Sequence, residues 1–168
     1  MIRKATKREV VRLIEIVRAA SASMSATGID QWDEVYPNAD VLKHDIAEGN
    51  LYVIEENKIV QGMVVLNEFQ DKEYADICWK YTNGKQLVVH RLCVHPDFQG
   101  MGVAKKLMVF AEEYARKTGY ASIRLDSFTQ NPTSEGLYTK LGYIKVGTVT
   151  FRKGIFYCFE KDVTCELL

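Results

Sequence analysis

Apolar residues recur along the chain with two different spacings, which predict an alternation of helices and strands. A spacing of three to four residues, typical of a helix with one buried face, follows Thr6 and recurs after Gly102. Short apolar runs that end at turn residues are typical of strands. The expected helices cover residues 10–21, 39–48, 103–117 and 132–141, and the expected strands cover residues 51–55, 59–66, 87–94, 122–126, 143–150 and 155–161.

Local signals mark the ends of several of these elements. Thr6, with Glu9 three residues later, matches a capping box at a helix start. The helical stripe that follows ends before a small polar stretch, residues 22–28, which we expect to be a loop. Gly62 inside a strand pattern indicates a bulge or a close approach of two backbones. No repeat, linker or low-complexity segment interrupts the series, so we expect one α/β (or α+β) domain over residues 1–168.

Composition narrows the class of protein. The chain has 168 residues, of which 47% are apolar and 26% charged, as is ordinary for a globular protein. The 22 basic and 22 acidic residues give a formal net charge of zero, which argues against nucleic-acid binding through bulk charge. No apolar run approaches the ~20 residues that span a bilayer, and the N-terminus lacks the apolar core of a signal peptide. We therefore expect no nucleic-acid or membrane partner and a cytoplasmic location.

The cysteines support the same location. They form no C-x-x-C pair, so we expect free thiols in a reducing compartment rather than disulfides or a metal site. The four cysteines are Cys78, Cys93, Cys158 and Cys165.

One stretch, residues 91–105, combines a strand, a glycine turn and a helix start. Pro96 ends the strand because it has no amide hydrogen for a ladder. Gly100 and Gly102 remove side chains where the helix begins, and the unpaired N–H groups of a helix start bind anions. We expect this turn to hold the pyrophosphate of a cofactor. The spacing excludes the dinucleotide fingerprint, because Lys105 occupies the place of its last glycine, and the P-loop pattern is absent.

Two blocks of sequence carry a resemblance to a known family. Residues 99–104 have the form Q-x-x-G-x-A after Leu-x-Val-His-Pro, which resembles the acyl-CoA motif of the GCN5-related N-acetyltransferases, the GNAT superfamily. Residues 131–143, which begin 32 residues after Gln99, resemble that family's N-x-x-A-x-x-L-Y-x-K-x-G-F segment. Ser134 and Tyr143 are mild departures, in place of Ala and Phe. Residues 156–161 are similar to the family's closing strand.

The resemblance implies a fold and an activity. The fold would be a mixed, mostly antiparallel central sheet of about six to seven strands, with helices on both faces. The sheet would be splayed between the strand ending at Val94 and the strand at residues 122–126. The activity would be direct transfer of an acetyl group from acetyl-CoA, without a metal, to a primary amine of a small molecule, peptide or protein. The alternative is a non-catalytic acyl-CoA-binding sensor or assembly domain.

The resemblance also assigns residues to the cofactor. The pyrophosphate would bind backbone N–H groups at the glycine turn, and the main chain of residues 92–94 would pair with the pantetheine amides like an added strand. Asn131 is also expected to cap the helix that it precedes. The complete expected set is Leu92, Cys93, Val94, Gln99, Gly100, Met101, Gly102, Val103, Ala104, Lys105, Asn131, Ser134, Tyr138 and Lys140.

Catalysis requires an acid and a base. Tyr138 matches the family's tyrosine, and a protonated phenol is able to donate a proton to the leaving thiolate. The base stays open between Glu68, at a strand end, and His90, which alternates with Leu92 and Val94. Asp126 is a further option, although a carboxylate at a strand end is usually a turn or cap residue.

The acceptor site is the least determined part. Gln31, Trp32 and Tyr36 are the candidates, and Trp32 is equally well explained as an aromatic wall for an amine or as a plug between helices. Cys93 is expected to be a core residue rather than a nucleophile. No feature selects a particular amine or acyl group. A homodimer is common among such domains, but the sequence does not show one.

Overall fold

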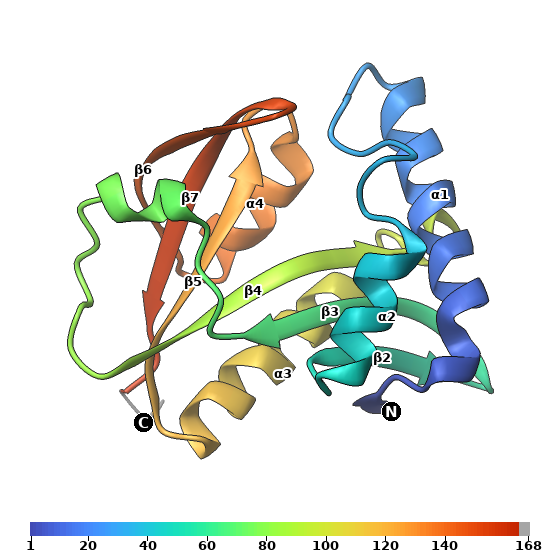
Figure 1. The fold of residues 1–168 in the computed structure, drawn as a ribbon, viewed down its shortest axis with the longest axis horizontal. Coiled ribbons are helices and arrows are strands. Elements are labelled where there is room, and N and C mark those ends of the chain that lie inside the picture. The colour runs from blue at the N-terminus through green and yellow to red at the C-terminus, as the bar shows by residue number, and fades with distance from the viewer. Residues whose placement is uncertain (165–168) are drawn as a thin grey trace. The chain divides into compact units, whose positions relative to one another are not determined.

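A computed structural model describes residues 1–164 (Figure 1). Helices and strands alternate as expected, and three 3-10 turns connect them. In chain order the elements are β1 (Ile2–Lys4), η1 (Lys7–Glu9), α1 (Val10–Ala26), α2 (Ala39–Ala47), β2 (Leu51–Glu56), β3 (Ile59–Asn67), η2 (Lys72–Asp76), β4 (Lys85–Val94), η3 (Pro96–Phe98), α3 (Val103–Lys117), β5 (Tyr120–Phe128), α4 (Pro132–Lys140), β6 (Ile144–Phe151) and β7 (Gly154–Asp162).

The described strands form a seven-stranded sheet in the order β1-β2-β3-β4-β5-β7-β6. The β1–β2, β2–β3, β5–β7 and β6–β7 pairs are antiparallel, whereas β4 and β5 are parallel. The parallel ladder joins Lys85–Val88 of β4 to residues 120–124 of β5. The prediction of a mixed, mostly antiparallel sheet with six to seven strands is therefore confirmed.

Residue contacts divide the chain into two compact units, and each unit combines separate segments. Unit 1 contains Met1–Leu66 and His90–Phe110, and unit 2 contains, among the described residues, Asn67–Val89 and 111–164. Both β4 and α3 are divided between the units, so that one part of each element belongs to unit 1 and the other part to unit 2. The single domain over residues 1–168 stays a prediction.

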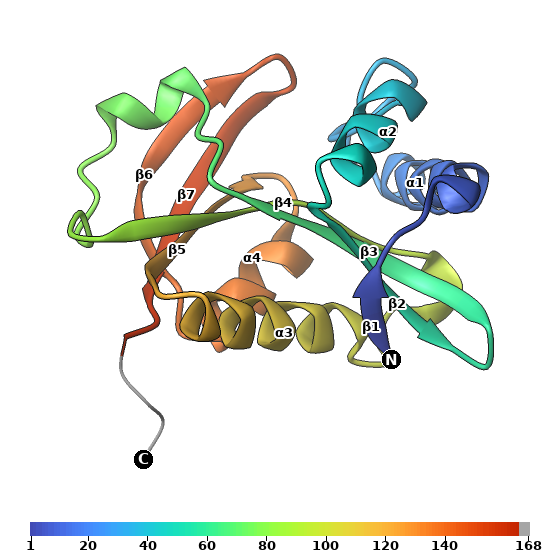
Figure 2. The same ribbon diagram turned by 60° about the horizontal axis from the view of Figure 1, so that its bottom comes forward.

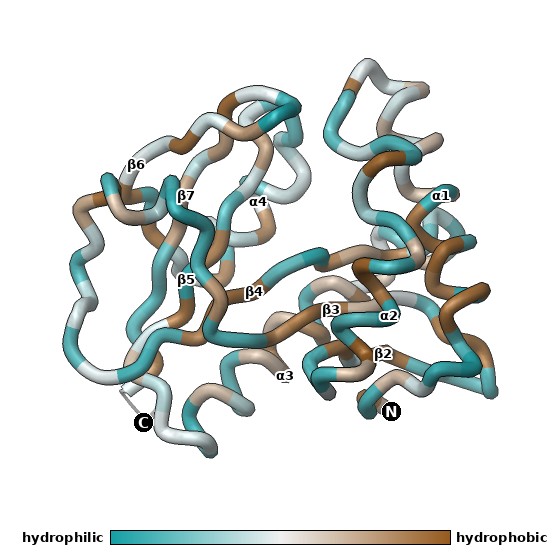
Figure 3. The backbone as a smooth tube through the Cα atoms, in the orientation of Figure 1, coloured by the Kyte–Doolittle hydropathy of each residue, from teal (hydrophilic) through white to brown (hydrophobic). Residues whose placement is uncertain are grey.

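In unit 1, helices cover both faces of the strands (Figure 2). Leu13 and Ile16 of α1 pack in one fully buried cluster with Val53 of β2 and Met63 of β3, and α2 adds its own apolar side chains. Figure 3 shows the corresponding hydrophobic stretches along α1, β2 and β3. On the opposite face, Tyr52 of β2 packs against Phe110 of α3, with ring centroids 5.0 Å apart. Alternate strand residues thus enter different cores.

The end of α1 differs from the prediction. The helix continues to Ala26, through most of the stretch 22–28 that was expected to be a loop. Alanine has the highest helix propensity, so this exposed end of the helix forms without an apolar stripe to reveal it. Gly28, at φ +81°, ends the helix, and the N–H of Ile29 donates to the carbonyl of Met24 at 2.9 Å.

The start of the same segment follows the sequence signals more closely. The carboxylate of Glu9 accepts a hydrogen bond from the Thr6 N–H at 2.7 Å, which confirms the capping box. The strand β1 was not predicted, because three residues are too few to show a period. It pairs with β2, so that Arg3 faces Val53.

Gly62 marks a close backbone approach, as expected. A Cβ at this position would lie 2.7 Å from the Cys93 carbonyl oxygen, well inside normal contact. The β2–β3 register also shifts between Ile54 and Glu55, next to the pairing of Ile54 with Gly62. Gly62 therefore marks a close backbone approach and also lies next to a bulge, the two features that a glycine in a strand pattern predicted.

In unit 2, the pairing of β5 with β7 defines two faces. Asp126 lies opposite Cys158 and Arg124 opposite Glu160, whereas Leu125 lies opposite Phe159 on the other face. We name these the polar face and the apolar face of β5.

The segment 68–85, whose pattern predicted no element, covers the polar face. The buried carboxylate of Glu160 accepts hydrogen bonds from the N–H groups of Lys80 and Tyr81, at 2.5 and 3.2 Å. The guanidinium of Arg124 stacks over Trp79, 4.3 Å from the ring centroid. Polar contacts and stacking order this segment, so hydrophobic periodicity gave no sign of its position.

Candidate active site

The glycine turn of unit 1 begins where β4 ends. The side-chain amide of Gln99 donates to the carbonyl of Val94 at 3.0 Å and so ties the turn to the strand end. Gly100 and Gly102 have φ values of +75° and +78°, which glycine adopts without the strain of a Cβ. The expected strand, turn and helix start are confirmed in this order.

The geometry of this turn fits a bound anion. No heavy atom lies within 4 Å of a Cβ placed on Gly100 or Gly102, so both positions open onto free space. In α3 the N–H of Lys106 donates to the carbonyl of Gly102 at 3.0 Å. The N–H groups of residues 103–105 precede this bond at the positive end of the helix dipole. The Lys105 side chain is exposed at the same end.

Cys93 of β4 has the environment of a core residue. It is buried in the cluster between the strands and α1, with its sulfur 4.0 Å from the carbonyl oxygen of Ile16. Burial raises the pKa of the Cys93 thiol to about 12. A thiol that stays protonated is a poor nucleophile.

The backbone of β4 is irregular next to His90. Arg91 has a φ of +51°, a left-handed conformation that is uncommon for a residue with a side chain. This residue interrupts the extended conformation from which the face of His90 was predicted. The placement of His90 on the face of Leu92 and Val94 stays a prediction.

Arg91 also anchors a polar cluster that the sequence did not reveal. Its guanidinium donates to the two carboxylate oxygens of Asp45 at 2.6 and 2.8 Å, and to the hydroxyl of Tyr36 at 2.8 Å. Asp45 lies on α2 and is buried. Only a long-range pairing of residues 46 positions apart marks this cluster, and a single sequence does not show such pairings.

The candidate acceptor residues occupy different environments. Trp32 is partly buried against the core cluster of α1, and its carbonyl accepts a hydrogen bond from Ser21 at 2.9 Å. This is the arrangement expected of a plug between helices. Gln31 is partly buried, and the ring of Tyr36 lies beneath Arg91 with 6.0 Å between the guanidinium and the ring centroid.

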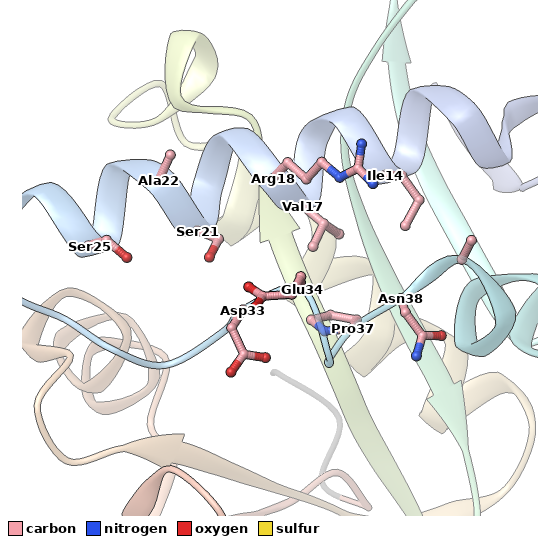
Figure 4. Close-up of a pocket in the computed structure, with 11 residues that line it drawn as sticks. Ile14, Val17, Arg18, Ser21, Ala22, Ser25, Asp33, Glu34, Pro37 and Asn38 are labelled. Carbon is pink, nitrogen blue, oxygen red and sulfur yellow. The ribbon is translucent and has the colours of Figure 1, made fainter.

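A pocket of about 390 Å³ lies beside these residues, between α1 and the segment 33–39 (Figure 4). Val17 and Ser21 point from the helix toward Glu34 and Pro37. Gln31, Trp32 and Tyr36 are not among the described residues that line this pocket. The lining residues are Ile14, Val17, Arg18, Ser21, Ala22, Ser25, Asp33, Glu34, Pro37, Asn38 and Ala39.

Tyr138 of α4 lies in the core of unit 2, on the apolar face of β5. Its ring centroid is 5.7 Å from that of Phe159 and 6.0 Å from that of Tyr143. Burial raises the pKa of the Tyr138 hydroxyl well above its usual value, and the charge of Asp126 adds to the increase. The phenol is therefore protonated at neutral pH.

Asn131 caps the same helix, as expected. Its side-chain oxygen accepts a hydrogen bond from the N–H of Ser134 at 3.2 Å. Lys140, near the other end of α4, is exposed.

Glu68 lies at the opposite end of β5 from the residues after Asp126. Its carboxylate accepts a hydrogen bond from the Tyr120 hydroxyl at 2.9 Å and lies 3.7 Å from the Lys85 ammonium. Tyr120 is the first residue of β5, and Asp126 is six residues further on, a distance of roughly 20 Å along a strand.

Asp126 has a more specific environment than the sequence predicted. Its Oδ2 accepts a hydrogen bond from the hydroxyl of Tyr74 at 2.7 Å, while part of the side chain stays exposed. Burial raises the pKa of the Asp126 carboxyl to about 6, against the lowering effect of the Tyr74 hydrogen bond. Tyr74 belongs to η2, in the segment without a periodic pattern, so no sequence signal linked the two residues.

Among residues 1–164, no group of three or more histidine, cysteine, aspartate or glutamate side chains is arranged to hold a metal ion. None of the helices in this part of the chain has the length and apolar character that a membrane crossing requires. Cys78, Cys93 and Cys158 are free thiols, and Cys165 lies outside the described residues.

Comparison with known proteins agrees with this arrangement. The chain is 23% identical over 143 residues to the uncharacterised N-acetyltransferase YesJ of Bacillus subtilis, which covers 83% of this chain and 77% of that protein. For several further curated relatives the match spans less than half of the relative's length.

Solved structures share the fold. An acetyltransferase of the GNAT family from Streptococcus agalactiae is 25% identical with a TM-score of 0.85, covering 96% of this chain and 94% of that one. The PaiA N-acetyltransferase from Thermoplasma acidophilum, solved in complex with coenzyme A, is 19% identical with a TM-score of 0.74, covering 96% and 98%. The model of the acetyltransferase (GNAT) family matches residues 15–143, and the chain therefore belongs to this family.

Proposed function

We propose that this protein is an N-acetyltransferase that transfers an acetyl group directly from acetyl-CoA to a primary amine of a small molecule, peptide or protein. The observation that carries the proposal is the open glycine turn at the start of α3, in a chain of the GNAT family. The coenzyme A bound to the PaiA relative supports the same cofactor.

The residues of the turn have the properties that a pyrophosphate requires. The N–H groups from Gly100 to Lys105 would donate to phosphate oxygens, with glycine allowing close approach at two positions. Gln99 would hold the turn against the strand end, and Met101 is exposed beside it. The main chain of Leu92, Cys93 and Val94 would pair with the pantetheine, and Asn131, Ser134, Tyr138 and Lys140 would complete the set.

Tyr138 would supply the general acid. Bound acetyl-CoA contributes a thioester whose carbonyl carbon accepts the amine. Departure of a thiolate is easier when a proton is delivered to its sulfur, and the raised pKa keeps the Tyr138 phenol protonated until then. The main-chain N–H of Val94 would polarise the carbonyl.

The amine must first become neutral. Deprotonation of an alkyl ammonium, whose reference pKa is about 10.4, costs roughly 4–5 kcal/mol at pH 7. A nearby base that accepts this proton therefore lowers the barrier to acetyl transfer. His90 and Glu68 are candidates from the sequence, and the position of Glu68 near the start of β5 makes it the weaker one.

The acceptor would bind in the region of Gln31, Trp32 and Tyr36, where the pocket of about 390 Å³ provides space. In its lining the carboxylates of Asp33 and Glu34 would favour a cation, against the opposing charge of Arg18. The three free thiols of the described chain are compatible with a cytoplasmic location. A homodimer stays an expectation from the family.

A two-part assay tests the proposal. Calorimetry measures acetyl-CoA binding, and thiol release is followed with a panel of polyamines, amino acids, aminoglycosides and peptides. We expect binding together with turnover that depends on one class of amine. Binding without turnover on any amine would instead support the non-catalytic sensor.

A further inference from the structure

We infer that Asp126 accepts the proton of the acceptor amine and that Tyr74 is the positioning residue that holds its carboxylate. This inference rests on the proposed acetyl transfer and goes beyond it by assigning the base. It is based on three observations, all within unit 2: the hydrogen bond between the two residues, the burial of Tyr74, and the position of Asp126 on β5.

The hydrogen bond fixes the direction of the carboxylate. The Tyr74 hydroxyl donates to Oδ2 of Asp126 at 2.7 Å, and the Tyr74 side chain is only 2% exposed. The Tyr74 ring is held by Trp79, with centroids 5.1 Å apart, and the Trp79 indole N–H donates to the Tyr74 carbonyl at 2.9 Å. Asp126 as a whole keeps partial exposure, in contrast to Tyr74, so its carboxylate is not sealed inside the core.

The proposed base and acid lie on opposite faces of the same strand. Asp126 belongs to the polar face of β5, with Cys158 opposite, whereas Tyr138 packs on the apolar face against Phe159. Addition of an amine to a thioester brings nitrogen to one side of the carbonyl carbon while sulfur leaves from another. A base on one face of β5 and an acid on the other match the two proton transfers, which are removal of a proton from nitrogen and delivery of a proton to sulfur.

The surrounding groups keep the carboxylate basic. Burial and the negative charge of Asp71 raise the pKa of Asp126, the Tyr74 hydrogen bond lowers it, and the result is about 6. Tyr138 and Cys158 also lie within electrostatic range, and burial raises the pKa of both, so neither carries charge at neutral pH. Asp126 is therefore ionised at pH 7 but is a much stronger base than an exposed aspartate.

The protons balance over one turnover. The ammonium gives one proton to Asp126, and the neutral nitrogen attacks the thioester carbon. As the carbon–sulfur bond breaks, Tyr138 gives its proton to sulfur. The newly bonded nitrogen then loses a proton to solvent, and the Tyr138 phenoxide regains one from solvent. Asp126 then releases its proton to solvent. The products are the acetylated amine, coenzyme A and one proton.

The test compares pH profiles of kcat/KM for the wild type and two variants, using the best amine of the panel. For Asp126→Asn we expect a loss of about 10²–10⁴-fold, the range of general base catalysis, with acetyl-CoA affinity unchanged. For Tyr74→Phe we expect the acid limb to move up by about one to two pH units, since a hydrogen bond that favours the charged carboxylate is removed.

Asp71→Asn is the matched control. Removing a nearby negative charge lowers the pKa of Asp126, so the acid limb should move down, opposite to Tyr74→Phe. Thermal unfolding of each variant shows that it is folded, and Asp126→Glu, which keeps a carboxylate, should recover part of the lost activity. A merely structural role of Tyr74 would not move the acid limb of the pH profile in opposite directions in these two variants.

The outcomes separate the two proposals. If the wild type turns over an amine and the Asp126→Asn variant or the Tyr74→Phe profile is unchanged, the assignment of the base is wrong and acetyl transfer stands. If the wild type binds acetyl-CoA but acetylates no amine, the proposed function is wrong, and the assignment of the base is wrong with it.

Discussion

The guanidinium of Arg91 forms two parallel hydrogen bonds with the carboxylate of Asp45, at 2.6 and 2.8 Å. Both side chains are nearly inaccessible to solvent, with 12% and 4% exposure. The pair holds α2 against the irregular part of β4, where Arg91 adopts a φ of +51°. Tyr36 adds a third hydrogen bond at 2.8 Å and so connects the candidate acceptor segment to the same point.

Loss of this pair should be costly. Asp45→Ala leaves a buried guanidinium without its partner, which we expect to lower the free energy of unfolding by about 3–5 kcal/mol in urea denaturation. Asp40→Ala on the same helix is the control, since its contact with Lys43 is exposed and contributes little. Equal effects of the two substitutions would show that the Arg91–Asp45 pair adds no stability.

The glycine turn makes a prediction about the cofactor. Gly102→Glu places a carboxylate where phosphate would bind, and calorimetry should show acetyl-CoA affinity reduced by at least about tenfold. Gly28→Glu is a control for backbone strain, because Gly28 also has a positive φ of +81° and opens onto free space. Both variants should lose similar stability, while Gly28→Glu keeps its affinity. Normal affinity in Gly102→Glu would place the pyrophosphate elsewhere.

Tyr138 is the predicted general acid. Tyr138→Phe keeps the ring that packs on Phe159, so we expect kcat to fall by about 10²–10⁴-fold with little change in acetyl-CoA affinity. Tyr157→Phe, on β7 beside the same phenylalanine, should leave kcat close to the wild-type value. If Tyr138→Phe turns over at the wild-type rate, another group protonates the thiolate or chemistry does not limit the rate.

Two glycines should respond to alanine with opposite signs. Gly62→Ala brings a Cβ within 2.7 Å of the Cys93 carbonyl oxygen, and overpacking of this kind costs about 1–3 kcal/mol of stability. Gly136 lies inside α4 with nothing within 4 Å, so alanine there should stabilise by about 0.5–1 kcal/mol. Urea denaturation distinguishes the two, and a stable Gly62→Ala would mean that β3 and β4 separate without cost.

Much of the fold could be predicted because its signals are local. The apolar run of residues 87–94, the glycines at 100 and 102, and Asn131 before Pro132 each determine an element within a few residues. The last turns of α1 were not predicted, because an exposed Ala/Ser segment has no apolar stripe. The short strand β1 was not predicted, because its strand conformation depends on pairing with β2, which is distant in the sequence.

The candidate site divides in the same way. The cofactor turn is a local motif, so its geometry was predictable. The Tyr74–Asp126 and Arg91–Asp45 pairs join residues 52 and 46 positions apart, and nothing near either residue in the sequence announces the contact. Trp32 was equally compatible with two roles, and its packing on the α1 core depends on residues distant from it in the sequence.

Product analysis tests direct acetyl transfer most directly. The wild-type protein is incubated with acetyl-CoA labelled with ¹³C in the acetyl group and with the amine panel, and products and protein are examined by mass spectrometry. We predict label on the nitrogen of the acceptor amine and none on the protein, because the buried Cys93 thiol, with its pKa raised to about 12, does not form an acyl-enzyme. Label trapped on Cys93, or no labelled amine despite bound acetyl-CoA, would contradict the account.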